Sequence, residues 1–362
     1  MSTEPSSFME KLLTIEKVDL EYIVGKLSDF EINKLNNSSI LVTGASGFFG
    51  KNIMEFLIYL KIHRNIDLKI TAVTRNITNF RVKFPILDQI NFIKLVESHI
   101  GDLNSNIEDK FNFIIHAACD TDPDGLKNYP IEFLKENYLG IESILEIAKR
   151  SDTCSLLYLS SGAVYGVQNA DILCMDENSA TAPNINNIGS VYGESKRLGE
   201  MLCTIYAKQH NLKINIARCF SLVGPHMNFE GHYAIGNFIK NIADKEDIIL
   251  KSKNEVFRSY LYSADLVIWI IKILLSDRKN EVYNVGSTRD ITVKDLAKLV
   301  KQTLNSESNI IFKEGEVFNT TSSNRYVPSN SKIKGHLKVE EWTSLEEAIK
   351  KTYLWYLRNK SN

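Results

Sequence analysis

A glycine-rich turn near the start of the chain is the feature that most limits what this sequence can fold into. The stretch ILVTGASGFFG, residues 40–50, places Gly44, Gly47 and Gly50 three residues apart, after a short apolar run and before a helical pattern. Glycine adopts backbone angles closed to other residues and lets a ligand approach the main chain closely. Strand, glycine turn and helix in this order are typical of a dinucleotide-binding unit, in which the helix N-terminus binds the pyrophosphate. We therefore expect a dinucleotide to bind at this turn.

Short β-branched runs alternate with amphipathic helical patterns after this turn. Near-continuous apolar strands that alternate with helices indicate a parallel sheet covered on both faces. The sequence therefore predicts an α/β fold with a doubly wound parallel Rossmann sheet. The expected strands are residues 39–44, 69–74, 91–96, 111–118, 155–161 and 213–220, and the expected helices include residues 50–61, 130–150 and 189–210.

The domain organisation follows from where this alternation starts and ends. Residues 1–37 are polar and helix-prone, which predicts an N-terminal helical extension of unknown role. Residues 38–220 carry the regular pattern and are assigned to the Rossmann domain. Residues 221–362 are less regular and are assigned mainly to a smaller C-terminal α/β substrate-binding lobe, with residues 279–288 returning to the Rossmann domain. The sequence shows no internal repeat and no low-complexity linker.

Composition excludes several classes of function. With 43 basic and 44 acidic residues the net charge is −1, so there is no electrostatic case for nucleic acid or an anionic membrane surface. The five cysteines are scattered without CxxC spacing, which indicates neither a disulfide framework nor a metal site and fits a reducing cytosol. The N-terminus lacks the pattern of a secretory signal, and the longest apolar run, 266–275, is too short to span a bilayer. We therefore expect a cytoplasmic protein.

The end of the second strand bears on which dinucleotide binds. NAD-binding proteins usually place Asp or Glu there to bind the ribose 2′-hydroxyl. This chain has Thr74, Arg75 and Asn76 instead, and Arg75 could pair with a 2′-phosphate, which favours NADP over NAD. Asp102, in the GDL segment after the third strand, is predicted to reach the adenine amino group. For both charged residues a solvated surface position remains the alternative.

A second group of residues suggests proton transfer. Tyr192 and Lys196 are four residues apart on a predicted helix and so share one face. A phenol is a poor base at neutral pH, and a nearby lysine cation lowers its pKa. Ser161 stands at the end of the fifth strand, in SSGAVYG, on the side of the sheet where ligands bind. We predict that Ser161, Tyr192 and Lys196 are the catalytic residues.

Together these motifs resemble the extended branch of the short-chain dehydrogenase/reductase family, the NAD-dependent epimerase/dehydratase group that acts on nucleotide sugars. The resemblance covers residues 38–355 and implies NAD or NADP as cofactor, a nucleotide-diphosphate sugar as substrate, and a homodimer. It implies that Tyr192 is the acid/base, that Lys196 lowers the pKa of Tyr192 and binds the ribose, and that Ser161 holds the substrate oxygen. Its motifs here are TGASGFFG, GDL, IIHAA, SSGAVYG, YGESK, RCFSLVGP, RSYLYSADL, YNVGS and RYVPS.

The resemblance completes the two predicted binding sites. Arg258 would clamp the substrate pyrophosphate, with Arg325 as a second phosphate ligand. For His232 and Asn237, near the expected sugar, a surface or structural role is the alternative. The predicted cofactor site comprises Gly44, Ser46, Gly47, Phe48, Phe49, Gly50, Arg75, Asp102, Leu103, His116, Ala117, Ala118, Tyr192 and Lys196, and the predicted substrate site comprises Ser161, Ser221, His232, Asn237, Arg258 and Arg325.

Departures from the family pattern narrow the reaction. Members that eliminate water carry Thr-Asp-Glu before VYG, and decarboxylating relatives keep the Glu, whereas this chain has Gly162 and Ala163. Members that combine 3,5-epimerisation with reduction have a Cys where Gly162 stands. Ser221 replaces the Asn of the RxxNxxGP pattern, which often contacts the substrate. The missing carboxyl groups argue against dehydration and decarboxylation.

What remains is oxidoreduction at one sugar carbinol, expected at C4. We rank a 4-epimerase first, because SSGAVYG resembles the UDP-galactose epimerase pattern most closely. An NADPH-dependent 4-ketoreductase, favoured by Arg75, is the alternative. A dehydratase that uses Asp120, Asp122 or Asp124, or a decarboxylase, ranks lower, and a non-catalytic nucleotide-binding protein on the same fold ranks last.

Overall fold

The structure is a computed structural model that describes residues 13–119, 123–169, 171–231, 233–250, 254–312 and 319–360. The chain divides into two compact units that interleave along the sequence. Unit 1 contains the residues up to Gly166 together with Thr181–Arg218 and Val267–Tyr283. Unit 2 contains Val167–Ala180, Cys219–Leu266 and the residues from Asn284 onward.

A seven-stranded sheet forms the centre of unit 1, in the order β11-β6-β5-β4-β1-β2-β3. The pairs β4–β5, β1–β4, β1–β2 and β2–β3 are all parallel, as the apolar runs predict. This is the doubly wound, Rossmann-like α/β fold expected from the sequence. The strands are β1 (Ser38–Thr43), β2 (Leu68–Thr74), β3 (Ile93–Glu97), β4 (Phe113–His116), β5 (Ser155–Ser161), β6 (Ile214–Cys219) and β11 (Val282–Val285).

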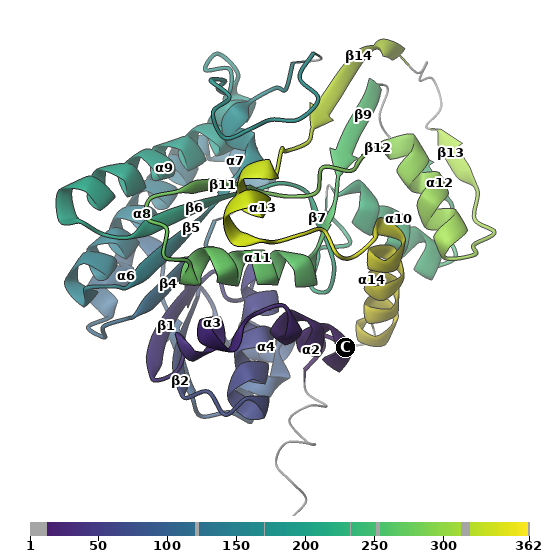
Figure 1. The fold of residues 1–362 in the computed structure, drawn as a ribbon. Coiled ribbons are helices and arrows are strands. Elements are labelled where there is room, and N and C mark those ends of the chain that lie inside the picture. The colour runs from purple at the N-terminus through teal and green to yellow at the C-terminus, as the bar shows by residue number, and fades with distance from the viewer. Residues whose placement is uncertain are drawn as a thin grey trace, which may run out of the picture. The chain divides into compact units, whose positions relative to one another are not determined.

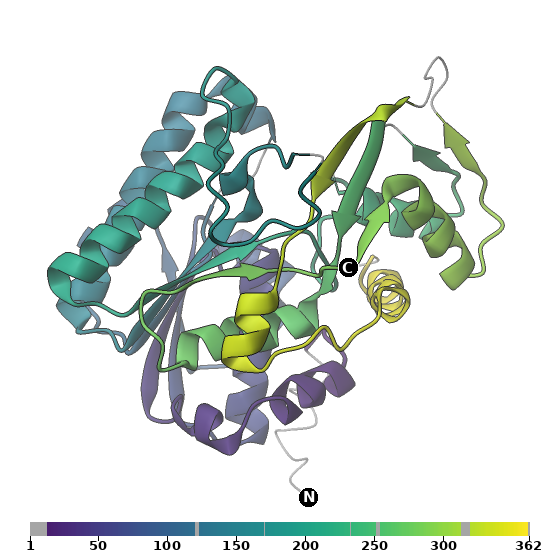
Figure 2. The same cartoon turned by 45° about the horizontal axis from the view of Figure 1, so that its top comes forward.

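Helices cover both faces of this sheet. Figures 1 and 2 show α8 and α9 on one face and α4 and α11 on the other. The face under α8 and α9 is a continuous core that includes Leu41, Ile114, Leu156 and Ile216, all buried. The helices and turns of this unit include α4 (Phe48–His63), α5 (Ile77–Lys83), η2 (Ile100–Asp102), α6 (Leu103–Asn106), α7 (Pro123–Asn128), α8 (Pro130–Ser151), η3 (Gly162–Tyr165), α9 (Val191–His210) and, in its larger part, α11 (Ser263–Leu275).

The described residues before β1, 13–37, include two short helices, α2 (Lys17–Gly25) and α3 (Asp29–Asn33). The fully buried carboxylate of Glu55, on α4, accepts hydrogen bonds from the backbone N–H groups of Thr14 and Ile15, at 2.9 Å and 2.8 Å. Lys272 of α11 pairs with Glu31 at 2.9 Å. The described part of the N-terminal extension is therefore attached to the helices that cover the sheet.

Unit 2 is assembled from small sheets and helices. Its sheets are β12-β9-β14, β13-β8 and β10-β7, and β14 runs parallel to β9 whereas β12 runs antiparallel. The strands are β7 (Leu222–Val223), β8 (Ile248–Leu250), β9 (Asn254–Ser259), β10 (Leu261–Tyr262), β12 (Asp290–Thr292), β13 (Ile310–Phe312) and β14 (Asn319–Tyr326), and the helices are α10 (Ala234–Ala243), α12 (Val293–Thr303), α13 (Ser331–Leu337) and α14 (Leu345–Asn359).

Two segments lie in a different unit from the one in which the sequence-based boundaries place them. Residues 167–180 belong to unit 2 because Met175 N–H donates to Val327 O at 2.9 Å and Gln168 bridges to Arg325. Most of α11 belongs to unit 1, and Trp269 on it is fully buried. Within the described ranges, no helix is long and apolar enough to cross a membrane, and no cluster of His, Cys, Asp or Glu could hold a metal ion.

Candidate active site

The three glycines of the first motif have different structural roles. Gly44 has a φ of +65°, and a Cβ there would lie 2.7 Å from Ala117 O. A Cβ on Gly50 would lie 2.2 Å from Gly44 O, so both positions require glycine for the turn to close. Gly47 is the N-cap of α4, and among described residues its Cβ would meet only Gly44 O, at 3.4 Å. The protein itself therefore leaves open the space that a side chain at Gly47 would fill.

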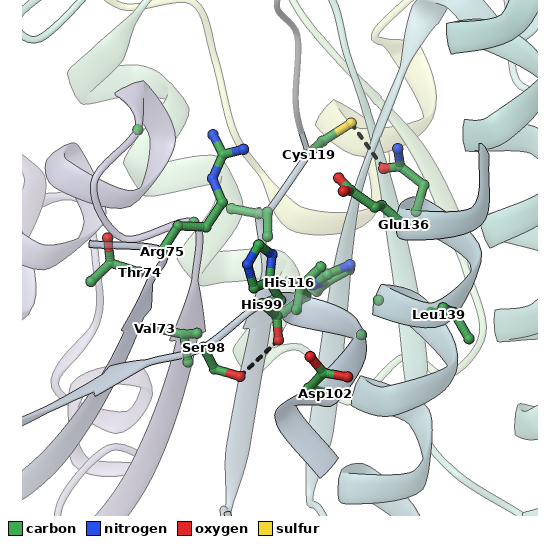
Figure 3. A pocket seen from close by; sticks show the side chains of 18 of the residues that line it. Val73, Thr74, Arg75, Ser98, His99, Asp102, His116, Cys119, Glu136 and Leu139 are labelled. Carbon is green, nitrogen blue, oxygen red and sulfur yellow. Dashed lines mark hydrogen bonds between the residues drawn. The ribbon is translucent and has the colours of Figure 1, made fainter. Parts of the chain in front are cut away.

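That space belongs to a pocket of about 390 Å³ in unit 1 (Figure 3). The first N–H groups of α4 lack partners within the helix, and the helix dipole favours an anion there. A side-chain-free helix N-terminus at a pocket fits the pyrophosphate of a dinucleotide. The predicted cofactor residues that line the pocket are Gly44, Ser46, Gly47, Arg75, Asp102, His116, Ala117 and Ala118.

Besides Tyr192 and Lys196, four residues predicted for the cofactor lie outside this lining. Leu103 is fully buried in the core beneath α8, and the Phe48 and Phe49 rings contact each other edge to face at 5.6 Å. Gly50 serves the close approach of α4 to the turn. Leu103 and Gly50 therefore serve packing, whereas Phe48 and Phe49 begin α4 and carry the first backbone N–H groups of that helix.

Charged side chains reach the pocket from three elements (Figure 3). Arg75 follows β2 and is exposed, Asp102 ends η2, and Glu136 lies on α8. Glu97, at the end of β3, accepts the N–H of Ile77 at 2.7 Å and so fixes the start of α5. In many proteins of this fold an acid after β2 binds the ribose. In this chain Arg75 occupies that position and lines the pocket.

The predicted catalytic residues come from β5 and the helix that packs on it. Tyr192 is in the first turn of α9, and Lys196 follows one turn later. The buried Lys196 Nζ donates to Leu159 O of β5 at 2.9 Å. Ser161 ends β5, and its Oγ accepts the N–H of Ala163 at 3.1 Å. The helix can approach because Gly193 has no side chain: a Cβ there would lie 2.6 Å from Ala163 O.

A buried ion-pair network also attaches this helix to the sheet, and its central carboxylate, Glu200, belongs to none of the motifs recognised in the sequence. Arg218 of β6 donates to both carboxylate oxygens of Glu200, to Oε1 at 2.9 Å and to Oε2 at 2.7 Å, and to the Tyr165 hydroxyl at 2.8 Å. Ser160 Oγ donates to Glu200 Oε1 at 2.6 Å. The pair with Glu200 and the bond to Tyr165 raise the pKa of the Arg218 guanidinium against the effect of burial. The spacing Lys196–Glu200, again four residues, is the sequence signal that could have revealed Glu200.

The comparisons with known proteins identify the family. The model of the NAD-dependent epimerase/dehydratase family matches residues 40–286. The chain belongs to this family. It is 28% identical over 319 residues to UDP-glucuronic acid decarboxylase 6 of Arabidopsis thaliana, covering 87% of each chain. The family resemblance expected from the motifs is thereby confirmed, and the relatives are nucleotide-sugar enzymes.

Solved structures show the same fold at lower identity. UDP-glucose 4-epimerase of Thermotoga maritima, with UDP-glucose, has a TM-score of 0.73 at 23% identity and covers 90% of this chain and 100% of its own. The dTDP-glucose 4,6-dehydratase of Bacillus anthracis, in complex with NAD, has a TM-score of 0.73 at 23% identity and covers 90% of this chain and 98% of its own. Epimerase, dehydratase and decarboxylase relatives thus all occur, and the family has NAD as its cofactor.

The two arginines predicted to bind substrate phosphate lie in unit 2, on adjacent strands. Arg258 of β9 pairs in register with Tyr326 of β14, and Arg325 pairs with Phe257. Side chains of successive residues alternate between the faces of a sheet. Arg258 accordingly faces the Tyr326 ring at 5.8 Å, while Arg325 lies 4.1 Å from the Phe257 ring and bonds to Asp290 at 2.5 Å. The two guanidinium groups therefore lie on opposite faces of this sheet.

The remaining predicted substrate residues are spread over unit 2. Ser221 follows β6, and its carbonyl accepts the N–H of Leu261 at 3.2 Å. Asn237 is a half-buried residue of α10. His232 lies outside the described residues, as do Asp120 and Asp122, which were considered as carboxylates for elimination.

Proposed function

We propose that this chain is an NAD(P)-dependent nucleotide-sugar 4-epimerase. The observation that carries the proposal is the group Ser161, Tyr192 and Lys196 beside a loop, Gly162–Ala163, that carries no carboxylate. The pocket at the glycine turn supports the cofactor. The substrate would be a nucleotide-diphosphate hexose, whose diphosphate we assign to Arg258.

Each residue has a separate task in this reaction. A bound nicotinamide dinucleotide supplies the hydride acceptor and donor. Tyr192 accepts the hydroxyl proton as the carbinol is oxidised, and returns it to the same oxygen when the carbonyl is reduced on its other face. The Lys196 ammonium stabilises the phenolate, and the Ser161 hydroxyl hydrogen-bonds to the reacting oxygen.

The Gly162–Ala163 loop argues against a reaction in which the sugar loses water or carbon dioxide. Elimination at the sugar needs an acid and a base beside the reacting carbons. In this chain Gly162 is buried and Ala163 offers only its backbone, whose N–H is bound to Ser161 Oγ. We infer that the activity differs from that of the decarboxylase relative, although the two chains share their family.

An NADPH-dependent 4-ketoreductase is the second candidate, and Arg75 favours it. Arg75 lines the pocket where NAD-binding relatives of this fold usually carry an acid. If Arg75 binds the 2′-phosphate, Arg75→Ala should raise the Kd for NADP about 10- to 100-fold and leave the Kd for NAD unchanged. Arg81→Ala, on α5, is the matched control. Calorimetry that finds a wild type preferring NAD, indifferent to Arg75→Ala, would remove the case for NADP.

The test of the reaction is the mass and stereochemistry of the products. Purified protein is incubated with UDP-, dTDP-, CDP- and GDP-hexoses, hexuronates and 4-keto-6-deoxy sugars. Unchanged mass with inverted stereochemistry is the expected outcome, and a gain of two hydrogens would mean the reductase. Tyr192→Phe should lower turnover about 10²–10⁴-fold while cofactor still binds, with Tyr129→Phe as control. Loss of water or carbon dioxide in a reaction that depends on Tyr192 would contradict the proposal.

We also propose that the protein is a homodimer that pairs through α8 and α9. On α9, Leu198, Met201 and Ile205 share one face and are 42%, 58% and 38% exposed. Tyr138 on the neighbouring α8 is 37% exposed. A second copy would bury this apolar face. Met201→Glu should halve the mass measured by light scattering and Leu354→Glu, on α14, should not; a monomeric wild type would refute the dimer.

A further inference from the structure

Three side chains form a row across neighbouring strands of the unit 1 sheet. Thr43 of β1 pairs in register with His116 of β4, and His116 pairs with Tyr158 of β5, so all three lie on one face. Thr43 Oγ1 and His116 Nδ1 share a hydrogen bond of 2.8 Å. The His116 and Tyr158 rings are stacked, with centroids 5.7 Å apart and planes inclined by 17°. We call these residues the Thr43–His116–Tyr158 row.

The row ends at Lys196. The Lys196 Nζ lies 5.1 Å from the centroid of the Tyr158 ring and donates to Leu159 O, the next residue of β5. An ammonium over an aromatic face is attracted by the ring quadrupole, more strongly when water is excluded, and both side chains are buried. The chain of contacts thus runs from the strand that enters the glycine turn to the lysine on α9.

We propose that Tyr158 is a positioning residue for Lys196, and that the stacked His116 ring holds the Tyr158 ring in place. The inference rests on the proposed function, in which Lys196 lowers the pKa of Tyr192. The Tyr158 ring and the Leu159 carbonyl together fix where the ammonium lies along α9. Tyr158 itself touches neither substrate nor cofactor in this scheme.

The helix carries a matching recess for the ring. Gly199 lies three residues after Lys196 on α9, and a Cβ there would be 2.3 Å from the Tyr158 hydroxyl oxygen. The phenol therefore lies in the space left by the missing side chain, and any other residue at position 199 would push the ring or the helix away. Tyr158 thereby also sets the distance between β5 and α9.

The electrostatics of the row suit this role. Burial raises the pKa of the Tyr158 phenol, against the nearby Lys196 charge; the other ionisable groups that face it are Cys203, Cys119 and Glu200. Burial first, and then the Lys196 charge, lower the pKa of His116 to about 3. Both rings are therefore uncharged at neutral pH, and the row adds no counter-charge that would weaken the effect of Lys196 on Tyr192.

The experiment compares the pKa of Tyr192 in Tyr158→Phe and Tyr158→Leu proteins. Phenolate absorbance is titrated in each protein and in the same protein with Tyr192→Phe, and the difference isolates Tyr192. Phe keeps the aromatic face, so its titration should match wild type. Leu removes that face and should raise the pKa of Tyr192 by about one unit, a tenfold loss of phenolate at a given pH. Tyr283→Leu, a buried tyrosine on β11, is the control for lost volume.

Each outcome decides the proposal. Equal titrations of the Leu and Phe proteins, or a wild-type Tyr192 with an ordinary pKa, would overturn the positioning role. If Tyr158→Leu does not fold, Gly199→Ala tests the same geometry by displacing the ring, and it should raise the pKa of Tyr192 in the same direction. The titration needs no substrate. A product assay that shows water loss would therefore overturn the proposed reaction and leave this result standing.

Discussion

The two units differ in how the predicted functional residues are distributed. In unit 1 the glycine turn, Arg75, His116 and Ser161 all follow or end parallel strands of one sheet. In unit 2 the predicted residues lie on a loop, on α10, and on two strands whose arginines face opposite ways. The carboxyl ends of parallel strands meet at one edge, so order along the chain predicts position in unit 1. No comparable rule governs the small sheets of unit 2.

The largest expected effect concerns the glycine turn of unit 1. Gly47 has a φ of −85° and a ψ of −179°, which any residue adopts, so Gly47→Val should fold. Its side chain would enter the pocket where we place the pyrophosphate. Calorimetry with NAD and NADP should show a Kd raised at least about 100-fold, roughly 3 kcal/mol.

Gly25→Val is the matched control, because a Cβ at Gly25 meets no atom within 4 Å among the described residues and Gly25 lies on α2, outside the pocket. Undiminished binding by a folded Gly47→Val protein would show that the cofactor does not use this turn.

The second effect concerns the opposed arginines of unit 2. Arg258→Gln should raise the KM for a nucleotide sugar about 10- to 100-fold, since it removes charge-assisted bonds to a diphosphate. Arg325→Gln should change KM less than about threefold and instead lower stability by about 1 kcal/mol, because it leaves Asp290 unpaired. Steady-state kinetics and urea unfolding separate the two outcomes. An equal rise in KM for both variants would contradict the assignment of one arginine to each face.

The sequence predicted the fold, the family and eight of the residues that line the pocket, because these depend on local order: strand, turn, helix. It could not show that Leu103 is fully buried, since an apolar residue at the end of GDL suits a pocket or the core equally well. It could not find the pairing of Glu200 with Arg218, which joins residues 18 apart through tertiary packing. Nor could it set the register of β9 against β14, on which the opposite orientations of Arg258 and Arg325 depend.

The smallest expected effect is a pH dependence of stability with opposite sign in the two units. In unit 1, burial and the Lys196 charge lower the pKa of His116 from 6.5 to about 3. The unfolded chain therefore binds a proton that the folded chain does not, and stability falls as pH drops through that interval. In unit 2, burial raises the pKa of Asp265 from 3.8 to about 6, against the hydrogen bonds from Thr343. There the folded chain holds the proton, and stability falls as pH rises from about 4 to 6.

Matched variants isolate the two contributions. His116→Asn and Asp265→Asn each keep a polar side chain and remove the titrating group. Relative to wild type, His116→Asn should remove a positive slope of the unfolding free energy against pH. Asp265→Asn should remove a negative slope of the same quantity. Each slope is at most about 1.4 kcal/mol per pH unit. Urea titrations every half unit from pH 4 to 7.5, followed by hydrogen exchange in each unit, measure both slopes. If the two variants remove slopes of the same sign, one of the two side chains is solvated in the folded protein. That side chain is the one whose Asn variant leaves the pH dependence of its unit unchanged.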